Sequence, residues 1–141
     1  MSASSFDRLL ATGGTEEVDN SADADHCAVV DWRSDPEETV EAFRSFLPAG
    51  FLRYEFPDDD HLLVHTGSRT TSLTLAPRLP AIPLADQLRR LLTPEHGAFL
   101  LRSSLGSDTA CYVVRPASWW QVFRRDHPDR FALFFTEADH A

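Results

Sequence analysis

Two histidines follow a run of three aspartates, and these residues are the ones in the chain best suited to bind a metal. Three residues separate His61 from His65, and Asp58, Asp59 and Asp60 precede them. On a helix this spacing would place both imidazoles on one face, where they bind zinc well. The segment has the pattern of a strand, however, and four strand residues span roughly 13 Å. We therefore expect no metal here. The aspartates predict a solvated turn, with contact to a basic partner as the alternative.

Acid–base catalysis requires titratable side chains that meet in a pocket, and the sequence does not show which of them meet. The candidates are His26, Asp31, Glu55, His65, His96 and His127. His96 and His127 stand at expected helix ends, where a capping or dipole role is typical. Asp31 lies in an apolar stretch and should be paired or stand at a strand end. We therefore assign no catalytic residue.

Known catalytic and cofactor motifs do not occur in the sequence. It holds only six glycines and none of the glycine patterns of dinucleotide sites, P-loops or hydrolase nucleophile elbows. All 13 basic residues are arginine, which excludes Schiff-base and Ser–Lys mechanisms. We expect a protein that is not an enzyme and needs no cofactor, and keep an uncharacterised small enzyme as an alternative.

A pair of tryptophans is the strongest indication of a binding surface. Trp119 and Trp120 are adjacent in an expected helix, so their side chains point about 100° apart and cannot both enter one core. One should pack with Phe123, and the other should lie near the surface. An exposed tryptophan near Arg124 and Arg125 would be typical of a protein-binding residue, although it could equally cover the core edge.

Charge is distributed unevenly along the chain. The net charge is −9, and residues 1–65 hold 15 acidic residues against four arginines, whereas residues 66–141 hold seven against nine. This balance disfavours nucleic acid and anionic membranes as partners. An acidic half can attract a basic protein, although it can also serve solubility alone.

The expected location is the cytoplasm. The first residues lack a basic segment followed by an apolar stretch, so we expect no signal peptide, and no run of 18 apolar residues predicts a membrane span. Cys27 and Cys111 are expected to be buried free thiols.

The pattern of residues predicts three regions. Residues 1–25 should form a polar, acidic arm with a short helix before Gly13 and a mobile linker from Thr15. Residues 26–136 should form one domain, and residues 137–141 a frayed tail. Asp35, Pro36 and the glutamates after them predict a helix start.

The rest of the pattern predicts short strands and two more helices. Strands are expected at 26–32, 51–56, 61–66, 70–76, 98–103, 109–114 and 131–135, with helices at 84–92 and from Pro116. The fold class is therefore α+β, with an antiparallel sheet of about six to seven strands and about three helices packed mainly on one face.

The order of elements in the second half resembles one group of proteins. A helix ending in Leu91-Leu92-Thr93-Pro94-Glu95-His96 is followed by Phe99-Leu100-Leu101-Arg102, Asp108-Thr109, Pro116-Ala117-Ser118-Trp119-Trp120 and Phe131. This run, over about residues 84–135, resembles small immunity proteins of bacterial polymorphic-toxin or contact-dependent systems. The resemblance implies a cytoplasmic inhibitor that covers the active site of a cognate toxin.

We therefore predict an immunity-type protein that binds a toxin or effector. A secretion chaperone or adaptor that holds an effector segment is the alternative, and the choice between monomer and homodimer stays open. The expected partner-binding residues are Glu55, Asp58, Asp59, Asp60, Trp119, Trp120, Arg124 and Arg125.

Overall fold

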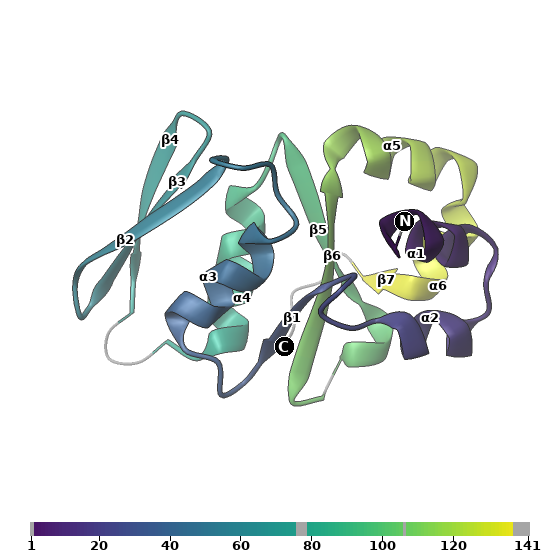
Figure 1. Ribbon diagram of the computed structural model, residues 1–141, viewed down its shortest axis with the longest axis horizontal. Coiled ribbons are helices and arrows are strands. Elements are labelled where there is room, and N and C mark those ends of the chain that lie inside the picture. The colour runs from purple at the N-terminus through teal and green to yellow at the C-terminus, as the bar shows by residue number, and fades with distance from the viewer. Residues whose placement is uncertain (1, 76–78, 106, 137–141) are drawn as a thin grey trace.

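A computed structural model describes residues 2–75, 79–105 and 107–136, which fold into alternating layers of strands and helices (Figure 1). The central sheet consists of β1 (Ala28–Asp31), β5 (His96–Leu101), β6 (Thr109–Pro116) and β7 (Phe135–Thr136). An outer sheet consists of β2 (Leu52–Asp58), β3 (His61–Thr66) and β4 (Arg69–Thr74). The helices are α1 (Ser2–Thr12), α2 (Thr15–Ser21), α3 (Pro36–Arg44), α4 (Ala81–Leu91), α5 (Ala117–Asp126) and α6 (Pro128–Phe134), with a 3-10 turn η1 (Arg102–Ser104).

The layers follow one another in the order outer sheet, helix pair, central sheet, helix group. Helices α3 and α4 lie between the two sheets, while α1, α2, α5 and α6 cover the opposite face of the central sheet (Figure 1). The α+β class and the strand number are confirmed. The expected arrangement is wrong in two respects: the seven described strands form two sheets, and the six described α-helices cover both faces of the central one.

Every strand pair is antiparallel. The central sheet has the order β1-β6-β5-β7, with Ala28 opposite Tyr112 in one pair and Gly97 opposite Arg115 in another. The outer sheet is a meander in the order β2-β3-β4, built from the three strands expected at 51–56, 61–66 and 70–76. Its second turn uses Gly67 at φ 60°, a left-handed conformation that glycine adopts without strain.

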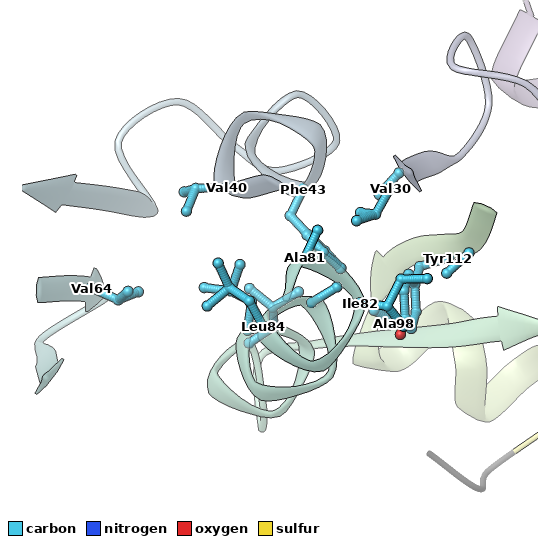
Figure 2. Close-up of a cluster of buried hydrophobic side chains, with 14 of the residues drawn as sticks. Val30, Val40, Phe43, Val64, Ala81, Ile82, Leu84, Ala98 and Tyr112 are labelled. Atoms are coloured by element: carbon cyan, nitrogen blue, oxygen red, sulfur yellow. The ribbon is translucent and has the colours of Figure 1, made fainter. Parts of the chain in front are cut away.

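The first hydrophobic core fills the space around α3 and α4. Phe43 of α3 and Leu84 of α4 are fully buried, and so are Val30 of β1 and Leu62 of β3. Figure 2 shows that side chains from both sheets point toward these helices. One continuous core therefore joins the outer sheet to the central sheet through the helix pair.

The second hydrophobic core lies on the other face of the central sheet and is mainly aromatic. The ring of Trp120 meets Phe99, Phe131 and Phe135 at centroid distances of 4.6, 5.9 and 5.0 Å. Its indole N–H donates to the backbone oxygen of Gly97 at 2.8 Å. A Cβ on Gly97 would lie 2.8 Å from the Trp120 ring, so only glycine permits this approach.

Two segments differ from the secondary structure expected of them. Residues 131–135 were expected as a strand, but Phe131 and Phe134 lie on α6 and point into the second core. A short apolar run does not distinguish a buried helix from a buried strand, and the spacing of three between these rings suits a helix. Helix α4 begins at Ala81 rather than near Leu84, and the expected tail at 137–141 lies outside the described residues.

The N-terminal segment is more ordered than the expected arm. Thr15–Ser21 forms α2 instead of a mobile linker, and Val18 on it is fully buried. Phe6 and Leu10 of α1 are also fully buried in the second core. Three apolar side chains among polar neighbours thus suffice to dock the segment, because each removes a large apolar area from water.

Arg130 joins α6 to the end of α1. Its guanidinium donates to the backbone oxygens of Leu9, at 3.0 Å, and of Leu10 and Gly13. These carbonyls stand at or just after the carboxyl end of α1, where backbone oxygens carry partial negative charge; that of Leu9 also accepts from the N–H of Gly13 at 2.7 Å.

We expect Arg130→Ala to lower the free energy of unfolding by about 1.5–3 kcal/mol, because three carbonyls lose a charged donor. Urea denaturation would measure this loss, with Arg125→Ala as the control, since Arg125 is exposed and pairs with its neighbour Asp126. Equal losses in the two variants would contradict the role assigned to Arg130.

Candidate partner-docking site

Trp32 is held outside both cores by the turn that follows β1. The backbone oxygen of Asp31 accepts from the N–H of Ser34 at 2.9 Å, and its carboxylate accepts from the N–H of Arg33 at 2.9 Å. The N–H of Trp32 donates to the backbone oxygen of Asp108 at 3.0 Å. The turn is therefore fixed on both sides, and the Trp32 side chain stays 52% exposed.

The helix that follows this turn begins with a reciprocal cap. The carboxylate of Asp35 accepts from the N–H of Glu38 at 2.7 Å, and the Glu38 carboxylate accepts from the N–H of Asp35 at 3.0 Å. Such a capping box stabilises the first turn of a helix, whose N–H groups would otherwise lack partners. The helix start that the sequence predicted at Asp35 is therefore confirmed, and the cap fixes the Asp35 carboxylate in the wall that Trp32 also lines.

A hollow of about 400 Å³ opens beside Trp32. Its walls come from four segments: the turn after β1, the start of α3, the turn between β2 and β3, and the chain around the start of α4. The lining residues are Trp32, Arg33, Ser34, Asp35, Pro36, Asp59, Leu75, Leu79, Pro80 and Ala81. The N–H of Leu75 donates to the backbone oxygen of Asp60 at 2.6 Å, which ties the acidic turn to this wall.

The charges around the hollow are mainly negative. Asp59 makes no hydrogen bond or ion pair with any residue that the structure describes. An adjoining hollow of about 220 Å³ is lined by two more acids, Asp31 and Glu38. The guanidinium carbon of Arg33 lies 4.9 Å from the Trp32 ring centroid, a distance at which cation and ring attract each other.

Asp58 shapes the acidic turn rather than the hollow itself. Its carboxylate accepts from the N–H of Asp60 and from Nδ1 of His61, each at 2.8 Å. The hydrogen bond from His61 holds the pKa of the Asp58 carboxyl below its ordinary value. The turn therefore keeps its negative charge and presents Asp59 outward.

The predicted partner-binding residues do not form one surface. Asp58, Asp59 and Asp60 lie in the turn of the outer sheet, whereas Trp119, Arg124 and the rest of their group belong to α5, beyond the central sheet (Figure 1). The structure thus places an acidic group and an arginine–aromatic group on different sides of the molecule.

The two tryptophans of α5 differ in exposure, as their angular separation predicted. Trp120 is only 3% exposed, so its side chain belongs to the second core and offers almost no surface to a partner. Trp119 is half-buried and stacks on Phe123 with a centroid distance of 5.0 Å. Arg115 lies 5.5 Å from the Trp119 ring. Trp119 therefore covers the edge of the second core.

The two arginines predicted beside these tryptophans make different contacts. Arg124 lies 4.3 Å from the ring of Phe131 on α6 and 5.8 Å from that of Phe99 on β5. The Arg125 guanidinium donates to the carboxylate of its neighbour Asp126 at 2.8 Å. Both side chains remain exposed.

Glu55 belongs to a short chain of polar groups across the outer sheet. Nε2 of His65 lies 3.3 Å from the Glu55 carboxylate, and its Nδ1 lies 2.8 Å from the Thr70 hydroxyl. Hydroxyl, imidazole and carboxylate follow one another as in a nucleophilic triad. Glu55 is 62% exposed, however, and such catalysis also requires a pocket with donors for an oxyanion. None of these three residues lines the hollows described above.

His96 lies in a place that the sequence did not predict. It opens β5 instead of capping a helix, it is 8% exposed, and its ring lies 4.6 Å from that of Phe51. Its Nδ1 has no hydrogen-bond partner among the described residues. Burial lowers the pKa of the His96 imidazole, while nearby Glu95 acts in the opposite direction.

The hollow contains functional candidates that sequence reasoning missed, chiefly Trp32 and Arg33. The available signal was an aromatic and an arginine placed directly between a strand and a capped helix start. That position must be a turn, and a turn keeps large side chains near the surface. Asp31 was correctly expected at a strand end.

Comparisons with known proteins add no relative: no protein-family model, curated protein or solved structure matches this chain. Within the described ranges, no helix is long and apolar enough to cross a membrane. In the same ranges, no three His, Cys, Asp or Glu side chains gather closely enough to hold a metal ion.

Replacing Trp32 and Trp120 in turn should separate a surface role from a core role. Trp32→Ala should change the free energy of unfolding by less than about 0.5 kcal/mol, because an exposed ring adds little to the fold. Trp120→Ala should lower it by about 3–5 kcal/mol through the cavity that it leaves. Urea titration of both variants measures this, and a large loss in Trp32→Ala would contradict the placement of Trp32 outside the core.

Acid should destabilise the protein through His96. In the unfolded chain this imidazole takes up a proton as the pH falls below about 6.5, whereas the buried ring resists protonation. The stabilising contribution of neutral His96 is therefore complete above that pH and is lost as the pH falls toward the lower pKa of the folded state.

The control for this effect is His96→Phe, which keeps an aromatic ring against Phe51 but cannot titrate. Between pH 7 and pH 5 the parent should lose more unfolding free energy than this variant in parallel denaturant titrations. Superimposable pH dependences would contradict the assignment.

Proposed function

We propose that this chain is an immunity-type protein that binds a basic region of a toxin or effector and occludes its active site. The observation that carries the proposal is the convergence of Asp35 and Asp59, which are distant in sequence, beside the exposed Trp32. An aromatic side chain within a polar, charged rim is typical of the residues that dominate binding energy in protein interfaces.

Charge complementarity selects a basic partner. The rim presents carboxylates from three separate segments of the chain, and among the residues that the structure describes Arg33 is the only cation lining either hollow. A rim of one sign raises the rate at which an oppositely charged protein associates and discriminates against acidic proteins. The resemblance over about residues 84–135 supports the same class of function, although that part of the chain lies mainly outside the hollow.

A secretion chaperone or adaptor is the second candidate, and the strand edges of the outer sheet favour it. Strands β2 and β4 stand at the two edges of that sheet and pair on one side only. An extended effector segment can add a strand to such an edge. The two candidates predict different partners: an inhibitor caps a folded catalytic domain, whereas a chaperone holds an unfolded segment and is commonly a dimer.

The experiment is size-exclusion chromatography with the protein encoded next to this chain, followed by kinetic measurement of the complex. We expect a 1:1 complex at micromolar concentration, with association slowed by added salt. The triple variant Asp58→Asn, Asp59→Asn, Asp60→Asn should lower the association rate on the order of tenfold at low ionic strength.

The matched control removes three acids from α2, through Glu16→Gln, Glu17→Gln and Asp19→Asn. It changes the net charge by the same amount on the far side of the central sheet, so its association rate should stay close to that of the parent. Equal slowing by both triple variants would mean that net charge alone, and not the acidic turn, attracts the partner. No complex at micromolar concentration would contradict the proposal.

A further inference from the structure

We propose that the hollow beside Trp32 receives the guanidinium of a partner arginine, which displaces Arg33 from the tryptophan ring. This inference rests on the proposed function, since it names the chemical group that the partner inserts. It follows from three features of the hollow: its aromatic wall, the Asp59 carboxylate, which has no partner among the described residues, and the Arg33 guanidinium beside the Trp32 ring.

The walls of the hollow match a planar cation. Trp32 offers an aromatic face, Leu75, Leu79 and Pro80 offer apolar contacts, and Asp59 offers a carboxylate. A guanidinium stacks on aromatic faces, is weakly hydrated for an ion and pairs with carboxylates through two parallel hydrogen bonds. A lysine ammonium is strongly hydrated and cannot stack on an aromatic ring. On entering the hollow it would therefore lose more hydration energy than a guanidinium and gain less from contact with Trp32.

The carboxylates are available for such a pair. Asp59 has no hydrogen bond or ion pair with the described residues; one oxygen of Asp35 receives the capping hydrogen bond, and the other has no partner among the same residues. Both side chains line the same hollow, from different segments of the chain. Its volume of about 400 Å³ lies in the range of roughly 300–1,000 Å³ that is usual for small-ligand pockets.

Arg33 shows that the ring accepts a guanidinium. Its guanidinium carbon lies 4.9 Å from the Trp32 centroid, and no ion pair joins this guanidinium to a carboxylate of the described residues. Among the described residues, the half-exposed Trp32 ring is thus the one group that contacts the Arg33 guanidinium. An arginine from a partner would gain the same stacking and also the Asp59 carboxylate, so it should replace Arg33 rather than bind beside it.

If a partner arginine displaces Arg33, then replacing Arg33 and replacing Trp32 should change the affinity for an arginine ligand in opposite directions. Removing Arg33 should strengthen binding of an arginine ligand, since the competitor is gone. Removing Trp32 or the Asp59 charge should weaken it. Simple attraction between net charges predicts no effect of Trp32 and treats all arginines of the protein alike.

The test uses isothermal titration calorimetry of the full chain with three synthetic ten-residue peptides of glycine and serine. The peptides carry three arginines, three lysines or three citrullines; citrulline keeps the shape of arginine without its charge. We expect the arginine peptide to bind at least about tenfold more tightly than the citrulline peptide, with the lysine peptide between them.

Three variants and one control complete the test. Trp32→Ala and Asp59→Asn should each weaken binding of the arginine peptide at least about tenfold. Arg33→Ala should tighten it about threefold or more, whereas Arg8→Ala, which removes an equal charge from α1, should change it by less than about twofold. Thermal melting establishes that each variant is folded, which is expected because all four side chains are exposed.

The inference is overturned if the citrulline peptide binds as well as the arginine peptide, if Trp32→Ala binds normally, or if Arg33→Ala binds more weakly. Its failure can be separated from that of the proposed function. If the partner complex forms and neither Trp32→Ala nor Arg33→Ala changes its affinity, only the arginine site in the hollow is overturned. Peptide binding with the expected variant effects, but no partner complex, overturns only the proposed function.

Discussion

Burial of the α3–α4 pair between two sheets is the constraint on which the rest of the structure depends. Five apolar residues of α4 are buried, from Ala81 and Ile82 at its start through Leu84 and Ala85 to Leu88. When a helix is apolar on more than one side, a single sheet face cannot bury all of its apolar side chains. The outer sheet is therefore a requirement of the α4 sequence, and Leu62 and Val64 of β3 supply the second face.

This burial also assembles the candidate docking site. The outer sheet cannot cover the helix pair without bringing its β2–β3 turn toward the ends of α3 and α4, and there Asp59 and Leu75 join Trp32. The hollow thus forms because the layers pack together. Its walls come from segments that are distant in the sequence, so no local pattern predicts it. Contacts at the other end of the outer sheet, such as the ion pair of 2.5 Å between Arg69 and Glu95, help to hold the layers in register.

Local features of the fold were readable from the sequence, and features that depend on layer packing were not. The capping box at Asp35, the meander with its Gly67 turn and the unequal exposure of Trp119 and Trp120 all follow from short-range rules. The division into two sheets depends instead on how much of α4 is buried, which periodicity alone does not reveal. The run around Phe131 was ambiguous for the same reason.

The candidate site also depends on layer packing, so the sequence predicted even less of it than of the fold. Composition predicted a solvated acidic turn, with contact to a basic partner as the alternative, but its neighbour Trp32 was assigned to a strand because it follows an apolar run. The sequence did not distinguish which of Trp119 and Trp120 is buried, and the structure places Trp120 in the second core, where Gly97 admits its ring. Exposure, and not residue type, separates a binding aromatic from a core aromatic, and exposure is set by tertiary packing.

Docking of the partner beside Trp32 is tested most directly by a heteronuclear NMR spectrum of the three tryptophan indole N–H groups, recorded with and without the partner. If the partner docks at the hollow, the Trp32 signal shifts or broadens on binding while the Trp120 signal, whose N–H is bonded to Gly97, stays in place. A spectrum in which Trp32 is unchanged and Trp119 shifts would place the partner on α5 and contradict docking at the hollow.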